Sequence, residues 1–252
     1  MIAEHADETE VVEEENYFVS MTDMMVGLVF VFIILLMYFA LQFRDVTEEL
    51  SGADRTRAQI LKQLQQSLHE KGVEVSIDTQ NGVLRLPDSI LFDSARAELK
   101  PEGHAAVGHL AEALRDVLPC YVDGGAPRAP TCPKTNHRIE SIYVEGHTDA
   151  DRYAGSGALK DNWDLSVVRA TNTYRALTEI KPELGALCVD KGPRCEPVLN
   201  VSGYGPQRPV SMGPANDEAT KRLNRRIDVR LIMVTPDAGA SVEALRDRLD
   251  KR

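Results

Sequence analysis

An uninterrupted apolar run near the N-terminus constrains this chain of 252 residues more than any other feature. It reads MMVGLVFVFIILLMYFAL from Met24 to Leu41, without a charged residue or a proline. A bilayer core about 30 Å thick needs about 20 helical residues, so we expect a single transmembrane helix over residues 17–43. The alternatives are a buried soluble helix and a signal peptide, but a signal peptide has basic residues before a shorter apolar core.

The negative charge of the chain is concentrated before this run. Residues 1–23 contain eight acidic residues and no Lys or Arg, so the remaining 31 acidic and 29 basic residues nearly cancel. Residues 1–16 are therefore an acidic tail. No basic block stands out elsewhere, which argues against nucleic acid as a partner, because phosphate contacts need clustered Lys and Arg.

The four cysteines form two close pairs in Gly/Pro-rich stretches, Cys120 with Cys132 and Cys188 with Cys195. Neither pair has the CxxC or Cys/His spacing of a zinc site. We interpret them as two disulfides that staple loops, with free thiols as the alternative. Disulfides persist in oxidising compartments, so this interpretation indicates the periplasm.

The charges beside the apolar run favour the opposite orientation. Arg44, Arg55, Arg57 and Lys62 follow the run and no basic residue precedes it, so the positive-inside rule alone would place the C-terminal part in the cytoplasm. However, long domains translocate largely regardless of charge, and the two cysteine pairs indicate an oxidising compartment for the C-terminal part. We therefore expect a single-pass protein of the bacterial inner membrane with a cytoplasmic N-terminus and a periplasmic C-terminal domain.

Residues 44–72 are polar and helix-prone, and we expect a periplasmic linker helix there. Its apolar residues are close to a spacing of three and four: Val46, Leu50, Ala53, Ile60, Leu64 and Leu68. This stripe is compatible with parallel pairing of two copies, although the pattern is interrupted at Arg57. A helix that packs on its own domain would give the same pattern, and both alternatives stay open.

The remaining sequence alternates between strand-like and helix-like runs. Strands are expected at residues 73–78, 82–86, 139–146, 198–203 and 226–234, and helices at 101–118, 165–180 and 219–223. Alternation of this kind predicts an α+β protein whose domain, residues 73–236, is a two-layer α/β sandwich. Residues 237–252 are expected to be a peripheral C-terminal tail.

This region contains five motifs: LPDSILFDSARAELKPEG from Leu86, VEGHTD from Val144, NWDLSVVRA from Asn162, VSGYGPQRPV from Val201 and KRLNRRIDV from Lys221. In content and order they resemble an OmpA-like peptidoglycan-binding domain. The resemblance covers about residues 73–234. Two segments depart from it, because the loop between Asp149 and Asn162 is longer than is typical and residues 119–138 form an insertion.

The resemblance implies a site for the diaminopimelate of the peptidoglycan stem peptide. This amino acid presents an ammonium and a carboxylate on one carbon, so its receptor needs an anion close to a planar cation. Asp149 would take the ammonium, and Arg169 would form a bidentate pair with the carboxylate. The resemblance adds Thr148, Asn162 and Leu165 to the site, and Ser166 and Arg225 are expected there as well. Leu165 could instead be a core contact, and Arg225 a solubilising charge at a strand edge. Structural alternatives exist, since Asn162 could cap a helix and Arg169 could pair with Asp164 or Asp149.

Asp23 lies directly before the apolar run. Acidic residues within membrane helices are costly and tend to mark ion pathways, whereas an acid at a helix N-terminus can also serve as a cap. The chain as a whole resembles the MotB family of stator subunits. The features that carry this resemblance are the acidic tail, the single span with Asp23, the linker helix and the OmpA-like domain. The tail, the DMMVGLVFVFIILL segment and the cysteine-containing domain are most similar to the ZorB group of Zorya anti-phage defence systems.

The stator resemblance implies a homodimer bound to a polytopic MotA-like or ZorA-like membrane protein, with Asp23 as the ion-translocating residue of a motor that conducts protons more readily than sodium. A flagellar stator subunit and a passive cell-wall tether are the alternatives. No cofactor and no metal site are expected. Enzymatic activity is not expected either, because no paired carboxylates, nucleophile motif or metal cluster accompanies the binding motifs.

Overall fold

The computed structural model describes residues 7–127, 129–155, 159–190, 195–214 and 217–235. In chain order its elements are α1 (Asp7–Glu70), β1 (Ser76–Asp78), β2 (Val83–Pro87), α2 (Asp88–Leu91), α3 (Pro101–Val117), η1 (Leu118–Cys120), β3 (Ile139–His147), α4 (Asn162–Ile180), α5 (Pro182–Gly185), β4 (Leu199–Gly203), α6 (Glu218–Asn224) and β5 (Arg226–Met233). The chain divides into two compact units, one ending at Leu50 and one beginning at Ser51. The predicted tail at 237–252 and residues 1–6 lie outside the described residues.

The first unit is the N-terminal part of α1. Its segment Phe18–Arg44 is long and apolar enough to cross a membrane, and none of its most apolar window is buried within the structure. The helix begins at Asp7, so residues 7–16 of the predicted tail are helical. This confirms the expectation of a single apolar helix near the N-terminus.

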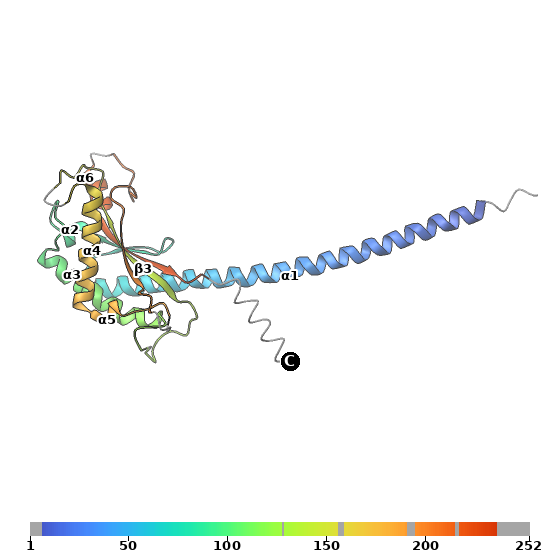
Figure 1. The fold of residues 1–252 in the computed structure, drawn as a ribbon, viewed down its shortest axis with the longest axis horizontal. Coiled ribbons are helices and arrows are strands. Elements are labelled where there is room, and N and C mark those ends of the chain that lie inside the picture. Colours follow the sequence, from blue (N-terminus) through green and yellow to red (C-terminus); the bar gives the residue numbers. More distant parts are fainter. Residues whose placement is uncertain (1–6, 128, 156–158, 191–194, 215–216, 236–252) are drawn as a thin grey trace, which may run out of the picture. The chain divides into compact units, whose positions relative to one another are not determined.

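The second unit contains a five-stranded sheet with the order β1-β2-β5-β3-β4. Strands β3 and β4 are parallel, and every other neighbouring pair is antiparallel. In the centre of the sheet, Val144 of β3 lies opposite both Val201 of β4 and Val229 of β5. Helix α4 connects the two parallel strands and contacts both of them (Figure 1).

The two faces of the sheet differ in polarity. On β5, Ile227, Val229 and Leu231 are buried in the hydrophobic core, and the residues that alternate with them include Asp228 and Arg230. The same core contains the buried side chains of α3 and α4, so these helices cover the apolar face. The predicted two-layer α/β sandwich is therefore confirmed, and charged side chains occupy the other face.

The C-terminal part of α1 belongs to this core. Ile60, Leu64 and Leu68 are completely buried, and Ala53 is nearly so, whereas Leu50 is 44% exposed. The apolar stripe of the linker helix thus packs on its own domain from Ala53 onward. Of the two alternatives that the sequence left open, this is the one that the structure supports.

Both expected disulfides are present, Cys120–Cys132 and Cys188–Cys195. The two stapled loops are joined, because the backbones of Gly124 and Cys188 exchange hydrogen bonds of 3.2 and 3.1 Å. They lie at the end of the sheet where β3 begins, since the amide of Ile139 donates to the carbonyl of Tyr121 in the first loop.

Truncation of Leu64 tests the packing of the linker helix. Because Leu64 is completely buried, we expect Leu64→Ala to lower the free energy of unfolding by about 2–5 kcal/mol. Leu50→Ala, the matched control on the exposed part of the helix, should change it by about 0.5 kcal/mol or less. Urea unfolding followed by the fluorescence of Trp163, the one tryptophan of the chain, measures both. This packing would be contradicted if both variants changed the free energy of unfolding by the same small amount. It would also be contradicted if the only effect of Leu64→Ala were to dissociate a dimer.

Candidate functional site

A groove of about 590 Å³ opens where β3 ends and α4 begins. Of the seven side chains that the sequence predicts for the binding site, six line this groove: Thr148, Asp149, Asn162, Leu165, Arg169 and Arg225. The seventh, Ser166, does not line it. The groove therefore brings together residues from three motifs that are far apart in the sequence.

Glycines in two motifs let α4 lie close to the strands. A side chain at Gly146 of β3 would collide with the backbone carbonyl of Ser166, and one at Gly203 of β4 would collide with Val167. The VEGHTD and VSGYG sequences thus supply the two backbone positions that α4 needs for close contact. This contact sets Asp149, which follows β3, beside Arg169 on the second turn of α4.

Arg169 forms a buried ion pair with Asp88 of α2, with a distance of 3.0 Å between Nη1 and Oδ1. Neither Asp149 nor Asp164, the alternatives considered from the sequence, is its ion-pair partner. Its Nε donates to the carbonyl of Arg96 at 2.8 Å, and its guanidinium lies 4.9 Å from the centre of the Phe92 ring. Burial raises the pKa of Asp88 and lowers that of Arg169, and the attraction between the two charges opposes both shifts.

Asp149 is paired with Arg225, whose Nη1 lies 2.6 Å from Oδ2. Arg225 also contacts Glu218 of α6 at 2.6 Å. Partial burial opposes the charged form of Arg225, but its hydrogen bonds to Glu218 and Asp149 are stronger in effect and raise its pKa. The groove is thus lined by the largely buried carboxylate of Asp149 with one guanidinium bound to it, and by a second guanidinium, that of Arg169, which is fixed separately.

Two further predicted residues, Asn162 and Ser166, have roles that the structure defines. Asp161, and not Asn162, caps α4, because its carboxylate accepts hydrogen bonds from the first amides of the helix. Asn162 instead donates to the carbonyls of Asp149 and Asp151 at 3.4 and 2.7 Å. Ser166 is completely buried, and its hydroxyl accepts from the amide of Gly205 at 3.0 Å. The prediction that Ser166 contacts a ligand is therefore corrected to a supporting position beneath the groove.

Asp88 and Phe92 are two of the groove residues that sequence reasoning did not single out. Both lie within the LPDSILFDSARAELKPEG motif, so their presence in the site was signalled by the motif as a whole.

Thr148 has a buried side chain, and its backbone amide donates a hydrogen bond of 3.0 Å to the carbonyl of Gly205. The loop after β4 consequently supports the strand end that carries Asp149.

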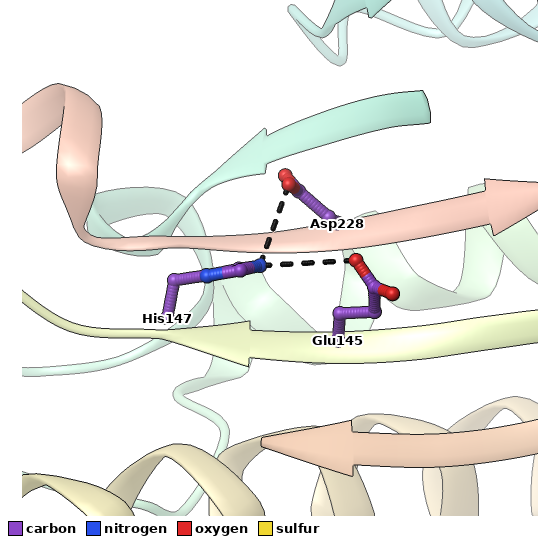
Figure 2. Close-up of side chains that lie close together, drawn as sticks. All are labelled: Glu145, His147 and Asp228. Carbon is purple, nitrogen blue, oxygen red and sulfur yellow. Dashed lines mark ion pairs between the residues drawn. The ribbon is translucent and has the colours of Figure 1, made fainter. Parts of the chain in front are cut away.

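A cluster of potential metal ligands lies on β3 and β5, formed by Glu145, His147 and Asp228 (Figure 2). Their ligand atoms are all within 4.8 Å of one another, and His147 Nε2 is 3.5 Å from Asp228 Oδ2. However, Arg230 donates to both oxygens of Glu145 at 2.8 and 2.9 Å, and Arg226 contacts Asp228 at 3.0 Å. A divalent ion would lie among these positive charges, so we interpret the cluster as structural.

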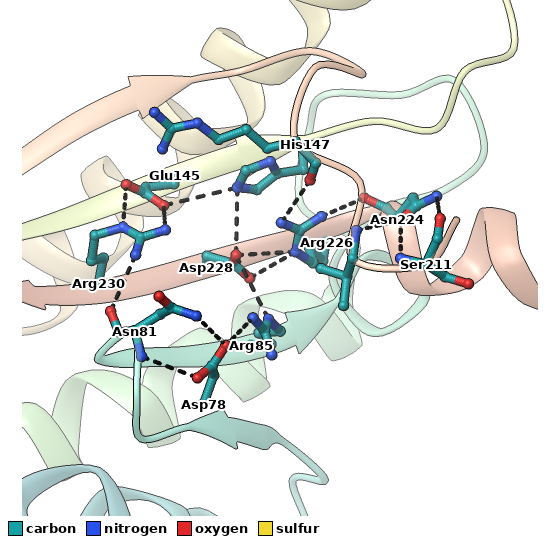
Figure 3. A network of polar contacts seen from close by, with 12 residues as sticks. Asp78, Asn81, Arg85, Glu145, His147, Ser211, Asn224, Arg226, Asp228 and Arg230 are labelled. Carbon is teal, nitrogen blue, oxygen red and sulfur yellow. Dashed lines mark hydrogen bonds and ion pairs between the residues drawn. The ribbon is translucent and has the colours of Figure 1, made fainter. Parts of the chain in front are cut away.

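The cluster is part of a polar network on the charged face of the sheet (Figure 3). It contains three carboxylates, Asp78, Glu145 and Asp228, and three guanidiniums, Arg85, Arg226 and Arg230. The formal charges of these six groups cancel, which offsets the cost of burying Glu145, Arg226 and Asp228 and of partly burying the other three. The ring of His147 stacks on Tyr204 at 5.4 Å, so the network also reaches the loop that supports the groove.

The similarity of this chain to known proteins is of low sequence identity. No family model matches the chain. Motility protein B of Bacillus subtilis (strain 168) is 26% identical over 179 residues, which are 71% of this chain and 56% of that protein. The chain thus spans little more than half of the length of this curated relative.

Solved structures give matches of low sequence identity. A MotB-like protein from Desulfovibrio vulgaris matches with a TM-score of 0.49 and 20% identity, over 71% of this chain and 94% of that one. The cell wall anchor of the type VI secretion system (T6SS) from Pseudomonas aeruginosa matches with a TM-score of 0.45 and 21% identity, over 72% and 99%.

The charged network predicts an acid-sensitive contribution from Asp78. Hydrogen bonds from Asn81, together with Arg85, lower the pKa of Asp78 from its ordinary value of 3.8 to about 2. A lowered pKa in the folded state stabilises the protein above pH 3.8, and the stabilisation is lost as the pH falls through about 2. Asp78→Asn should therefore cost about 2 kcal/mol near neutral pH, and the difference should vanish toward pH 2. Urea unfolding of both proteins at several pH values measures this, and a constant difference down to pH 2 would contradict it.

Proposed function

We propose that the groove binds peptidoglycan through the diaminopimelate of its stem peptide and anchors the chain to the cell wall. The single observation that carries this proposal is that the Asp149 carboxylate and the Arg169 and Arg225 guanidiniums line one cavity. A free amino acid head group carries an ammonium and a carboxylate on one carbon. A carboxylate beside planar cations is complementary to both charges.

Binding would exchange one ion pair for two. Asp149 is held by Arg225 in the empty groove, so an incoming ammonium would share or replace Arg225 on this carboxylate. The ligand carboxylate would then face Arg225 and Arg169. Arg169 is already oriented by Asp88 and by the carbonyl of Arg96, and this preorganisation lowers the entropic cost of binding.

We further infer that the chain is the wall-anchored, stator-type subunit of an ion-driven motor in the bacterial inner membrane. Similarity to Motility protein B of Bacillus subtilis supports this inference, and so does the apolar segment Phe18–Arg44, which includes Asp23. In this proposal the N-terminus is cytoplasmic, two copies associate, and a polytopic MotA-like protein surrounds them. Asp23 binds and releases a proton, and one charge moved through 100 mV supplies about 2.3 kcal/mol.

The motor is proposed to serve anti-phage defence of the Zorya type, with the chain in the position of ZorB. The resemblance of the acidic tail, the membrane segment and the cysteine-containing domain supports this role. The match to Motility protein B favours flagellar rotation as the second candidate. A deletion strain separates them, because loss of swimming with unchanged phage sensitivity would overturn the defence role.

Charge removal in the groove tests wall binding. Asp149→Asn and Arg169→Gln each remove a charged hydrogen bond to the ligand, so each should weaken binding to purified sacculi about tenfold or more. Asp116→Asn, which neutralises an exposed carboxylate on α3 outside the groove lining, should bind like the unmodified protein. Cosedimentation over a range of sacculus concentrations gives the affinities. The proposal fails if both groove variants sediment as well as the control.

Neutralising Asp23 tests the motor separately from the anchor. Asp23→Asn removes the proton-binding carboxylate, so it should abolish the motor-dependent phenotype, either protection from phage or swimming. Binding to sacculi should stay unchanged, because the groove lies in the other unit. Glu48→Gln, an acid beyond the apolar segment, is the matched control and should retain function. Full function in Asp23→Asn would leave only a passive tether.

A further inference from the structure

The outer wall of the groove is formed by the first part of the long loop after β3. Asp151 fastens this loop on one side, because its carboxylate is 2.7 Å from the ammonium of Lys221 on α6. Its carbonyl also accepts a hydrogen bond of 2.7 Å from Asn162 at the start of α4. The backbone at this point is therefore tied to two helices that border the groove.

Tyr153 fastens the same loop on the opposite side. Its hydroxyl lies 3.5 Å from the carbonyl of Ala95, in the segment that follows α2, and donates a long hydrogen bond to it. Both Ala95 and Tyr153 line the groove, as does Arg152, which lies between the two fastened residues. The loop thus presents Arg152 at the groove between two residues, Asp151 and Tyr153, that are each bonded to other parts of the domain.

Arg152 differs from the other arginines of the groove in its pairing. Arg169 is paired with Asp88, Arg225 with Asp149 and Glu218, and Arg222 lies 3.7 Å from Glu218. Arg152 forms no ion pair with another residue in the described ranges. Arg152 is an exposed residue that lines the groove, so its guanidinium is available to an anionic group of a ligand.

The size of the groove indicates a ligand larger than one charged head group. A pocket of 300–1,000 Å³ commonly encloses a ligand of drug size, and about 590 Å³ lies in this range. A ligand held at Asp149 would therefore extend along the groove toward the rim. We propose that Arg152 forms a second subsite, which binds a further carboxylate of the same stem peptide; this rests on the proposed binding of peptidoglycan.

Two carboxylates of a stem peptide have the required chemistry. One belongs to the acidic residue that precedes the diamino acid, and the other ends the chain after it. Both are planar anions, and a guanidinium binds such groups with two parallel hydrogen bonds. The first carboxylate can be removed by amidation, and the second can be moved by extension of the peptide. Neither change alters the ammonium and carboxylate of the diamino acid, so the two carboxylates can be distinguished.

Calorimetric titration of the full-length protein in detergent with a synthetic stem tripeptide tests the subsite. Arg152→Gln should weaken binding about fivefold, the size expected for a charge pair that is exposed to solvent. Arg175→Gln is the matched control, because Arg175 is an exposed arginine on α4 that does not line the groove. This variant should bind within about twofold of the unmodified protein.

Two modified peptides identify the carboxylate. If it belongs to the preceding acidic residue, amidation of that residue should make Arg152→Gln and the unmodified protein bind equally. If it is the terminal carboxylate, extension of the peptide by one residue should have that effect. Unchanged affinity in Arg152→Gln, or a loss that persists with both modified peptides, would overturn the second subsite alone. No binding of any peptide by the unmodified protein would overturn the proposed function itself.

Discussion

The buried ion pair between Asp88 and Arg169 is the interaction on which the groove depends. Both side chains are almost completely shielded from water, and isolating either charge in such a place costs several kcal/mol. The pair links α2 with α4, which are separated in the sequence by α3 and β3. It keeps a guanidinium in a fixed orientation at the groove and leaves the carboxylate of Asp149 to Arg225 and to a ligand.

The charged face of the sheet supports the end of β3, which Asp149 follows closely in the chain. Arg230 on β5 pairs across the strands with Glu145 on β3, and Arg226 pairs with Asp228 two residues further along β5. Ion pairs therefore follow the central strands toward the groove. His147 stacks on Tyr204. The neighbouring Gly205 accepts a hydrogen bond from the amide of Thr148 and donates one to the hydroxyl of Ser166. The groove is thus built on a rigid sheet end and not on a loop alone, which favours a precise site.

Much of the fold follows from the sequence, because alternation and turn residues are local signals. The expected strand at 139–146 and helix at 101–118 differ from β3 and α3 by one residue at one end. The pairing of charges could not be derived in this way, since Arg169 selects Asp88 through tertiary contacts and not through proximity in the chain. The linker helix was ambiguous for a similar reason: an apolar stripe has the same spacing whether it covers its own domain or a second copy.

The point where α1 enters the second unit and the groove residue Asp149 lie near opposite ends of β3. Gly52, where α1 enters this unit, lies against His137 just before β3 begins, and Asp149 follows the opposite end of the strand. In the proposed wall-anchored state, a pull between membrane and wall would therefore be directed along β3 and its neighbours. Tension in that direction loads the ladder hydrogen bonds together in shear, whereas a perpendicular pull would open them one after another. The joined disulfide loops reinforce the end of the sheet at which such tension enters.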